Sequence, residues 1–546
     1  MKENGEGMDL LTSAFVAVIC AIASSPLAAQ TVSFTAGPGG KVVEPTIPKV
    51  MDQVTGRTQT LVNLVKTIDL QGNGRPDILL IPGVYSIPGQ PWVPAPVRLL
   101  RPSGTGTISD VTRLYLGNGA LPATGSAPDV TIGDFNRDGK SDFFVAESGF
   151  DGLPFAGALN VLVESTANGS YADLSSTLPA ITAYTFSATT ADVNGDGIPD
   201  IYVGPLDTAN PQAKPYLLMG KANGAFDRVS STLPLWLADP IKWQKSFTSA
   251  LLVDVDNDGY PDLVLGRWRG GAYTSDSLIL LNDGHGDFSQ RAPIVLPPGA
   301  FGSDAETRKI ATIDANGDGY PDLLLVSTGK DFVGGQIQLL INRGNGTFVD
   351  ETLARLGPRA TVLAGYGWDG VSILDINGDG KLDILMQTGG YSCCGAPPDF
   401  AWINDGHGTF APVAVATLPP GSKARIVLAD ANGDGIPDLV SFDYNGDGDL
   451  HYQTYFNTSV RTVPSEPIIV SAAAGNAQAT VTFKPPVANG AAAITGYTAT
   501  CRFGTSVVVV TGGASPLTVT GLTNGKTYAC SVTATSPAGA AYHRSW

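Results

Sequence analysis

The sequence predicts an all-β protein, a seven-bladed β-propeller followed by a small β-sandwich. Three observations favour this fold class. Glycine and proline account for 66 and 39 of the 546 residues, and both interrupt helices but suit tight turns. An aspartate-rich nonapeptide recurs seven times at an even spacing. Short apolar and β-branched runs, bounded by Gly, Asn and Asp, separate the copies and indicate strands.

The first segment, residues 1–29, resembles a secretory signal peptide. An apolar run from Leu10 to Ala23 precedes small residues and a cleavage point near Ala28 or Ala29. This run is too short to span a membrane comfortably. We therefore expect a secreted or cell-surface protein without a membrane-spanning segment.

The composition is acidic, with a formal net charge of −17. Nucleic acids and anionic membranes attract basic surfaces, so this charge argues against either partner. The acidic residues are concentrated in the repeated nonapeptide, which directs attention to what those loops bind.

The nonapeptide has the pattern Asp-x-(Asn/Asp)-x-Asp-Gly-x-x-Asp. It begins at Asp134, Asp192, Asp254, Asp314, Asp375 and Asp430, and a weaker copy begins at Asp69. The starts lie 65, 58, 62, 60, 61 and 55 residues apart. Each unit contains four short strand-like runs, which is typical of a propeller blade. A closed ring is favoured over an open solenoid because no polar capping repeats flank the array.

Closure of such a ring usually combines both chain ends in one blade. The last unit supplies three strands before the chain leaves at residues 457–463. We therefore expect the fourth strand to come from Thr31–Thr35. The propeller is predicted to span residues 30–460, with a linker at 461–467.

The nonapeptide has the chemistry of a calcium loop. It offers oxygen atoms at alternate positions around a glycine, and Ca²⁺ takes six to eight oxygen ligands. Three or four carboxylates in so small a space repel one another unless a cation lies among them. Turn formation explains Asn-Gly and Asp-Gly but not an aspartate at position nine of every copy. An EF-hand is excluded because its closing acid stands at position twelve, where Val203, Leu265 and Leu325 lie here.

We expect six to seven calcium ions, held by the residues at positions one, three, five and nine of the loops. These residues include 21 of the 50 carboxylates of the chain. They are Asp69, Gln71, Asn73 and Asp77; Asp134, Asn136, Asp138 and Asp142; Asp192, Asn194, Asp196 and Asp200; Asp254, Asp256, Asp258 and Asp262; Asp314, Asn316, Asp318 and Asp322; Asp375, Asn377, Asp379 and Asp383; and Asp430, Asn432, Asp434 and Asp438.

From about residue 31 to 460, the loops and their flanking strands resemble the FG-GAP/VCBS repeats of integrin α-subunit propellers and of secreted bacterial proteins. The literal FG and GAP tripeptides are mostly absent, so the resemblance is to the bacterial VCBS branch. It implies structural calcium in the loops between the first and second strands of each blade. It also implies adhesion or ligand binding. A lectin or polysaccharide-processing protein of the cell surface is the alternative.

The face opposite the calcium loops is predicted to bind a protein or glycan ligand. Its connections hold five of the seven tryptophans, Trp92, Trp236, Trp243, Trp268 and Trp368. Exposed aromatic rings are common in binding hot spots, although packing of these rings between blades is the alternative.

Catalysis is not expected from the sequence. His285 and His407 occupy the same position of a repeated GHG turn, which assigns them a turn role. The sequence contains no GxSxG, HExxH or phosphate-binding loop. Abundant carboxylates leave a two-carboxylate glycosidase open on composition alone.

Residues 468–546 resemble an immunoglobulin-like domain of the fibronectin type III class. The resemblance lies in Gly496-Tyr497, Leu522, Asn524-Gly525 and Tyr528. It places Cys501 and Cys530 on neighbouring strands, which implies a disulfide in a secreted protein. The adjacent Cys393 and Cys394 are interpreted as part of a rigid loop rather than as a redox site.

Overall fold

The computed structural model describes most of the chain from residue 34 onwards. The described residues are 34–42, 60–73, 75–84, 93–149, 157–206, 213–238, 246–269, 276–366, 368–388, 400–414, 425–434, 436–444, 449–459, 463–486, 492–503, 506–537 and 539–540. The predicted signal peptide, Trp92, Trp243 and the Cys393–Cys394 pair lie outside these residues. Trp368 is described by its backbone alone.

Each repeat unit folds into one antiparallel sheet of the predicted four strands, except that the fifth sheet gains a fifth strand. The first sheet contains β2 (Thr60–Ile68), β3 (Asp77–Val84), β5 (Arg98–Pro102) and β6 (Ile108–Asp110); the second β8 (Asp129–Gly133), β9 (Asp142–Ala146), β10 (Val161–Ser165) and β11 (Tyr171–Asp173); the third β12 (Thr185–Ala191), β13 (Asp200–Pro205), β14 (Tyr216–Gly220) and β15 (Phe226–Val229).

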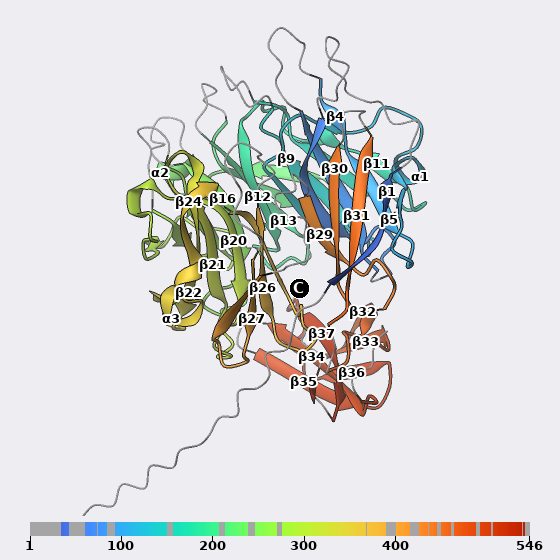
Figure 1. Cartoon of the computed structure of the whole chain (residues 1–546). Coiled ribbons are helices and arrows are strands. Elements are labelled where there is room, and N and C mark those ends of the chain that lie inside the picture. Colours follow the sequence, from blue (N-terminus) through green and yellow to red (C-terminus); the bar gives the residue numbers. More distant parts are fainter. Residues whose placement is uncertain are drawn as a thin grey trace, which may run out of the picture. The chain divides into compact units, whose positions relative to one another are not determined.

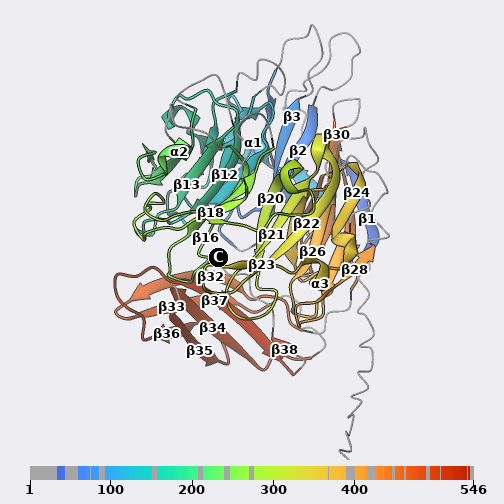
Figure 2. The same cartoon turned by 90° about the vertical axis from the view of Figure 1, so that its left-hand side faces the viewer.

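The next three sheets repeat this order. The fourth contains β16 (Phe247–Val253), β17 (Asp262–Arg267), β18 (Leu278–Leu280) and β19 (Ile294–Val295); the fifth β20 (Glu306–Ile313), β21 (Asp322–Thr328), β22 (Val333–Asn342), β23 (Phe348–Asp350) and, paired with β22, β24 (Thr361–Tyr366); the sixth β25 (Trp368–Leu374), β26 (Asp383–Thr388), β27 (Phe400–Asn404) and β28 (Phe410–Ala414). Figure 2 shows β20, β21 and β22 side by side in the fifth sheet.

The seventh sheet joins the two ends of the repeat region. It contains β29 (Arg425–Ala429), β30 (Asp438–Tyr444) and β31 (Leu450–Asn457), and its fourth strand is β1 (Phe34–Lys41). β1 lies antiparallel to β31, with Phe34 opposite Asn457 and Lys41 opposite His451 (Figure 1). Of the predicted strand Thr31–Thr35, residues 31–33 lie outside the described residues, and the N-terminal strand that completes the sheet runs from Phe34 to Lys41.

Each sheet packs against the next through a hydrophobic layer. Seven clusters of buried residues lie between successive sheets, and one of them joins the seventh sheet to the first. In that closing cluster Val440 and Phe442 of β30 pack with Ile78 and Leu80 of β3. Because every sheet buries both faces, its central strands are continuously apolar rather than alternating.

The aspartate loops connect the first strand of each sheet to the second. In all seven sheets the ninth residue of the loop is the first residue of the second strand. The sixth-position glycine has a positive φ in the loops where it is described, between 82° and 95° at Gly139, Gly197, Gly259, Gly319 and Gly380. That conformation is costly for other residues, which explains the glycine.

The remaining short elements lie in connections between strands. They are β4 (Ala95–Pro96) paired with β7 (Ala123–Thr124), the helices α1 (Thr112–Leu116), α2 (Leu235–Ala238) and α3 (Thr352–Arg355), and the 3₁₀ turns η1 (Ser175–Thr177), η2 (Gly302–Asp304), η3 (Lys330–Phe332) and η4 (Pro358–Ala360). In the part of the chain that the structure describes, no helix has the length and apolar character needed to cross a membrane.

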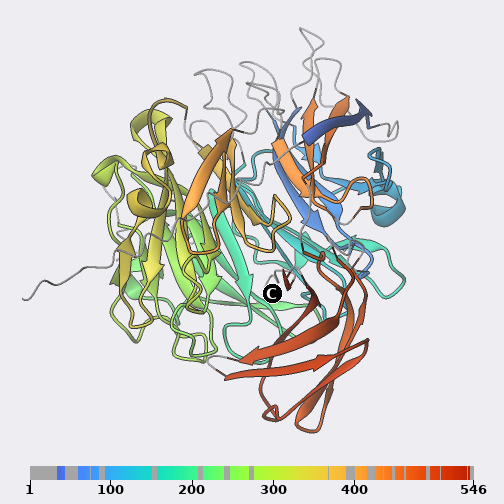
Figure 3. The ribbon, with the colours of Figure 1, turned by 60° about the horizontal axis from the view of Figure 1, so that its bottom comes forward.

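The C-terminal region forms two antiparallel sheets (Figure 3). One contains β32 (Ile468–Gly475), β33 (Gln478–Lys484) and β36 (Leu517–Thr520), and the other β35 (Ser506–Gly512), β34 (Gly496–Phe503), β37 (Ala529–Ser536) and β38 (Gly539–Ala540). One buried cluster includes residues of both sheets, among them Phe483 and Tyr497. Cys501 and Cys530 stand opposite each other on β34 and β37 and form a disulfide.

Candidate metal-binding loops

The aspartate at position one organises each loop through its own carboxylate. In the Asp254 loop, Oδ1 accepts a hydrogen bond from the backbone N–H of Asp258 at 3.0 Å and Oδ2 from that of Gly259 at 2.8 Å. The same carboxylate accepts from the fifth and sixth residues in the loops at Asp134, Asp192, Asp314 and Asp375. These bonds turn the backbone of the loop tightly around the carboxylate at position one.

The aspartate at position nine is buried beneath the loop. Asp262 is fully buried, and its carboxylate accepts from the backbone N–H of Asn282 at 2.8 Å and of Val255 at 3.0 Å. The equivalent pair of bonds is present at Asp142, Asp200, Asp322, Asp383 and Asp438. A carboxylate has about four acceptor sites, so two backbone bonds leave lone pairs for a cation.

Burial and mutual repulsion disfavour the ionised form of these buried acids. Burial raises the pKa of Asp262 to about 8, and the neighbouring charges of Asp256 and Asp258 add to the rise. Burial likewise raises the pKa of Asp142 and Asp322 to about 6, of Asp200 and Asp438 to about 7, and of Asp383 to about 8. A divalent cation would reverse this penalty, because it favours the charged carboxylate.

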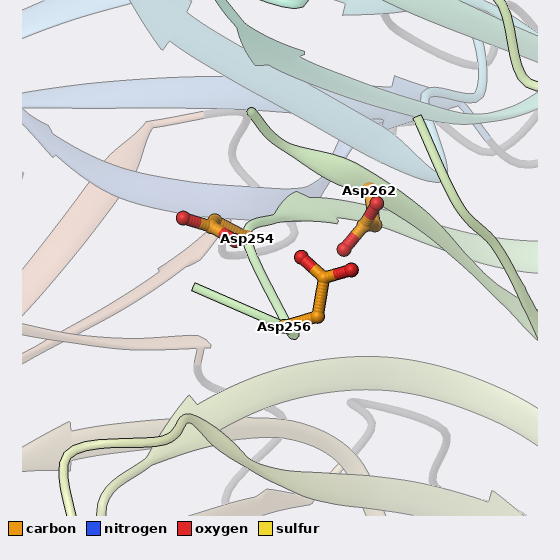
Figure 4. A group of neighbouring side chains, drawn as sticks. All are labelled: Asp254, Asp256 and Asp262. Atoms are coloured by element: carbon orange, nitrogen blue, oxygen red, sulfur yellow. The ribbon is translucent and has the colours of Figure 1, made fainter. Parts of the chain in front are cut away.

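The Asp254 loop brings three carboxylates within reach of one ion. Asp254, Asp256 and Asp262 each offer an oxygen, and these oxygens all lie within 4.8 Å of one another (Figure 4). Asp258 and the carbonyl of Tyr260 belong to the same loop. An all-oxygen donor set with several carboxylates fits Ca²⁺, which tolerates irregular coordination by six to eight oxygens.

The Asp69 loop differs from the others because an arginine binds its ninth-position aspartate. Arg101 of β5 donates from Nε to Oδ1 of Asp77 at 2.7 Å and from Nη2 to Oδ2 at 2.9 Å. When the oxygen and nitrogen of the Gln71 side-chain amide are exchanged, the amide oxygen accepts hydrogen bonds from both terminal nitrogens of Arg101 at 2.8 Å. Burial raises the pKa of Asp77, and the bond and charge of Arg101 oppose that rise.

A proline explains why this loop needs a different partner. In the other six sheets, the residue at the end of the third strand donates its backbone N–H to the ninth-position aspartate. The register of β3 and β5 places Pro102 at this position in the first sheet. Proline has no N–H to donate, and the Arg101 guanidinium bonds Asp77 instead.

Asparagines at or just beyond the ends of third strands connect neighbouring sheets, a role that the nonapeptide pattern did not predict. Asn282 donates its side-chain N–H to the carbonyl of Val193 in the preceding sheet at 2.8 Å, and Asn342 donates to Val255 at 2.7 Å. Asn457 makes the equivalent bond to Ile376 at 2.8 Å. Their recurrence about twenty residues after the ninth-position aspartate was the signal that identifies them.

The connections at the other ends of the strands contain an exposed aromatic ring between two arginines. Phe332 is 36% exposed, and the guanidinium carbons of Arg269 and Arg308 lie 5.3 and 5.7 Å from its ring centre. Glu306 pairs with both arginines, at 3.5 Å from Arg269 and 2.7 Å from Arg308. Asp331 and Phe332 have φ values of 55° and 61°, which are unusual for residues other than glycine.

The described tryptophans of this region do not form one cluster of exposed rings. Trp236 is half-buried and packs against the core between the third and fourth sheets, which favours the packing alternative for that ring. Trp268 is half-buried directly after β17. The binding role predicted for Trp236, Trp268 and Trp368 remains a prediction.

Comparisons with known proteins identify the repeat. A family model described as an FG-GAP-like repeat matches residues 65–145, 254–325 and 314–386. Integrin alpha-5 of Xenopus laevis is 26% identical over 215 residues, which cover 37% of this chain and 20% of the integrin. The chain thus spans about a fifth of that relative's length.

Two solved structures are similar to this chain at lower sequence identity. A rhamnogalacturonan lyase (PL11) of Bacillus licheniformis matches with a TM-score of 0.39 and 14% identity, covering 78% of this chain and 76% of the lyase. A six-bladed fucose-recognising lectin from Aleuria aurantia matches with a TM-score of 0.32 and 11% identity, covering 61% of this chain and 94% of the lectin. At these values neither structure identifies a ligand or an activity for this chain.

Proposed function

We propose that the chain is a secreted or cell-surface binding protein built on a calcium-stabilised, seven-bladed propeller, with calcium in a structural role. The observation that carries the proposal is the group of Asp254, Asp256 and Asp262, whose oxygens lie within 4.8 Å of one another. The seven successive sheets support the blade count, and the closing layer between the seventh and first sheets supports a ring.

Six calcium ions are proposed, one in each loop from Asp134 to Asp430. Among the described residues, the hydrogen bonds to the buried ninth-position aspartate of these loops come from neutral donors, and no arginine or lysine pairs with that carboxylate as Arg101 pairs with Asp77. At the Asp69 loop, Arg101 supplies that positive charge directly. The ions would neutralise repelling carboxylates in the native state alone and thereby stabilise it.

Ligand binding is assigned to the opposite ends of the strands. Phe332 offers an exposed ring with the guanidinium carbons of Arg269 and Arg308 at 5.3 and 5.7 Å from its centre, and Glu306 pairs with both arginines. Aromatic and arginine side chains are the commonest anchors of binding surfaces. Adhesion through a protein or glycan ligand is the first proposal, and a lectin or polysaccharide-processing role is the alternative.

The C-terminal sheets are proposed to be a fibronectin type III domain. The Tyr528 hydroxyl accepts a hydrogen bond from the backbone N–H of Thr523 at 3.1 Å, which resembles the tyrosine corner of such sandwiches. The Cys501–Cys530 disulfide supports an oxidising, extracellular location.

Metal analysis combined with calorimetry tests the proposal. Protein dialysed against calcium should retain six ions per chain, and removal by a chelator should lower the melting temperature by about 10 °C or more. Calcium should restore the transition, and Mg²⁺ at the same concentration should restore less because it demands octahedral geometry. An unchanged melting temperature with no retained calcium would contradict the proposal.

A glycan array and a binding screen test the ligand face separately. Phe332→Ala should reduce binding of any captured ligand while leaving the calcium content at six. Val349→Ala, at an exposed apolar residue of β23, is the control for loss of a surface side chain. Unchanged binding by Phe332→Ala would remove this region from the proposed surface.

A further inference from the structure

In each sheet, one residue of the third strand faces the ninth-position aspartate across the strand ladder. In five sheets this residue is apolar. The registers place Met219, Leu281, Ile341, Ile403 and Phe456 at this position. In the first sheet the residue is Arg101, which binds Asp77. In the second sheet it is Glu164, opposite Asp142.

Glu164 is a buried acid in a place where the other sheets hold an apolar side chain or a cation. The residue is 3% exposed. No hydrogen-bond donor reaches its Oε1 atom among the described residues. A buried carboxylate without a partner is strongly unfavourable, so this position calls for a positive ligand.

The surroundings of Glu164 place its carboxylate at the Asp134 loop. Gly224, in the turn between β14 and β15, lies against both Glu164 and the third residue of that loop. A β-carbon at Gly224 would stand 2.6 Å from Oε2 of Glu164 and 3.4 Å from Cβ of Asn136. The charges of Asp142, Asp134 and Asp138 add to the effect of burial in raising the pKa of Glu164 to about 8.

A second buried glutamate, Glu147 directly after β9, differs from Glu164 in its donors, although its Oε2 also has no hydrogen-bond partner among the described residues. Glu147 accepts three backbone hydrogen bonds at Oε1, from Gly125 at 2.9 Å, Ser126 at 3.0 Å and Gly149 at 3.1 Å. Glu164 lies on a strand beside the acidic loop and has no comparable set of donors in the described structure. Its location therefore points to a cation rather than to backbone donors.

We infer that Glu164 is an additional ligand of the cation in the Asp134 loop. The inference rests on the proposed function, because it assumes that the loop binds calcium. Glu164 would raise the number of carboxylates at this site from three to four, the number that the Asp254 loop supplies by itself. Since calcium affinity rises with the number of charged ligands, the Asp134 loop would become one of the tightest sites of the ring.

Glu164→Met tests the inference, since Met219 occupies the equivalent position of the third sheet. Calcium titration against a chromophoric chelator should show one of the six ions binding at least about tenfold more weakly, with the others unchanged. The metal-free variant should melt at a higher temperature than metal-free wild type, because a repelling carboxylate is gone. Glu164→Gln, which keeps one oxygen, should lie between the two proteins in calcium affinity.

Glu147→Gln is the control for removing a buried glutamate from the same sheet, and it should leave all six calcium affinities unchanged. Wild-type affinities in Glu164→Met, or equal destabilisation of that variant with and without calcium, would overturn the inference and leave the six-ion proposal intact. Wild-type protein that binds no calcium at all would instead overturn the proposed function and this inference together.

Discussion

The loops at Asp69 and Asp254 have similar backbone hydrogen bonds, but their buried ninth-position aspartates have different partners. Both begin with an aspartate that accepts backbone N–H groups and end with a buried aspartate at the start of the second strand. In the Asp69 loop that last aspartate binds Arg101 at 2.7 and 2.9 Å. In the Asp254 loop it receives two backbone N–H groups and lies near two further carboxylates.

We expect the residue that faces the ninth-position aspartate to determine whether that carboxylate needs a cation from solution. Arg101 brings a covalently attached positive charge, so the Asp69 loop is satisfied by the chain itself. An apolar residue, Leu281, faces Asp262, and Arg291 pairs with Asp256 of the same loop at 3.7 Å rather than with Asp262, so we expect a cation from solution to supply the charge at Asp262. The first sheet is therefore expected to keep its loop structure without metal, and the fourth is not.

The largest expected effect is the response of the whole ring to pH. The ninth-position aspartates from Asp142 to Asp438 have pKa values raised by burial to about 6–8, whereas unfolded aspartates ionise near pH 4. Their contribution to the stability of metal-free protein is therefore complete below about pH 4 and is lost as pH rises through 6–8.

Calorimetry of metal-free protein between pH 5 and 8.5 measures this loss. The melting temperature should fall by about 10 °C or more as pH rises, and saturating calcium should remove the fall because it favours the ionised carboxylates. Metal-free protein that is most stable near pH 8 would show that the buried aspartates are satisfied without a cation.

Matched substitutions at the two ninth-position aspartates give the next largest effect. Asp262→Asn removes a calcium ligand and leaves one backbone donor poorly matched, and we expect a loss of about 3–5 kcal/mol in calcium. In chelator the loss should be smaller, because one of the repelling charges is removed. Asp77→Asn leaves Arg101 without its carboxylate and should cost the same with and without calcium. Urea unfolding in both conditions measures the four differences, and an equal calcium dependence of the two variants would break the comparison.

Arg101→Met removes the guanidinium group that pairs with Asp77 and so measures its contribution to stability. It should cost about 2 kcal/mol, below the range for a fully buried pair because the Arg101 side chain is 28% exposed. The loss should be independent of calcium, and the calcium content should stay at six. Lys221→Met, which breaks an exposed pair with Asp227, is the control and should cost less than about 1 kcal/mol. A calcium content of five would mean that Arg101 had supported an ion rather than replaced one.

The repeat made much of the fold predictable from the sequence. The regular spacing of the nonapeptide predicted one sheet per unit, and the apolar runs predicted the strands. In the structure each second strand begins at the ninth-position aspartate. The extent of β1 was not predictable in the same way, since FTAGPGGK has neither alternation nor a run of β-branched residues. Its pairing with β31 depends on the unpaired strand edge that only the folded seventh sheet presents.

The position of the aspartate loops between the first and second strands was predictable, but the residues that face the ninth-position aspartates were not. Arg101 and Glu164 each lie more than twenty residues from the aspartate that they face, within strands whose register is set by packing. A charge inside an apolar strand was the available signal. The sequence predicts a metal site at the weaker Asp69 copy as at the other loops. In the structure its ninth-position aspartate, Asp77, forms an ion pair with Arg101.

The smallest expected effect concerns Lys140, whose ammonium group is expected to compete with calcium for Asp138. Lys140, at position seven of the Asp134 loop, donates from Nζ to Oδ2 of Asp138 at 2.8 Å, and both side chains are partly exposed. Such surface pairs contribute about 0.2–1 kcal/mol. Lys140→Met keeps the backbone carbonyl of position seven and should tighten calcium binding at this loop by about two- to fivefold, because Asp138 no longer has to leave an ammonium group.

Arg137→Met, in the same loop, removes a positive side chain that is not paired with Asp138 in this way and controls for the change in loop charge. Weaker calcium binding by Lys140→Met would contradict this prediction. It would mean that Lys140 helps the loop to bind calcium, whereas Arg101 is proposed to replace the ion.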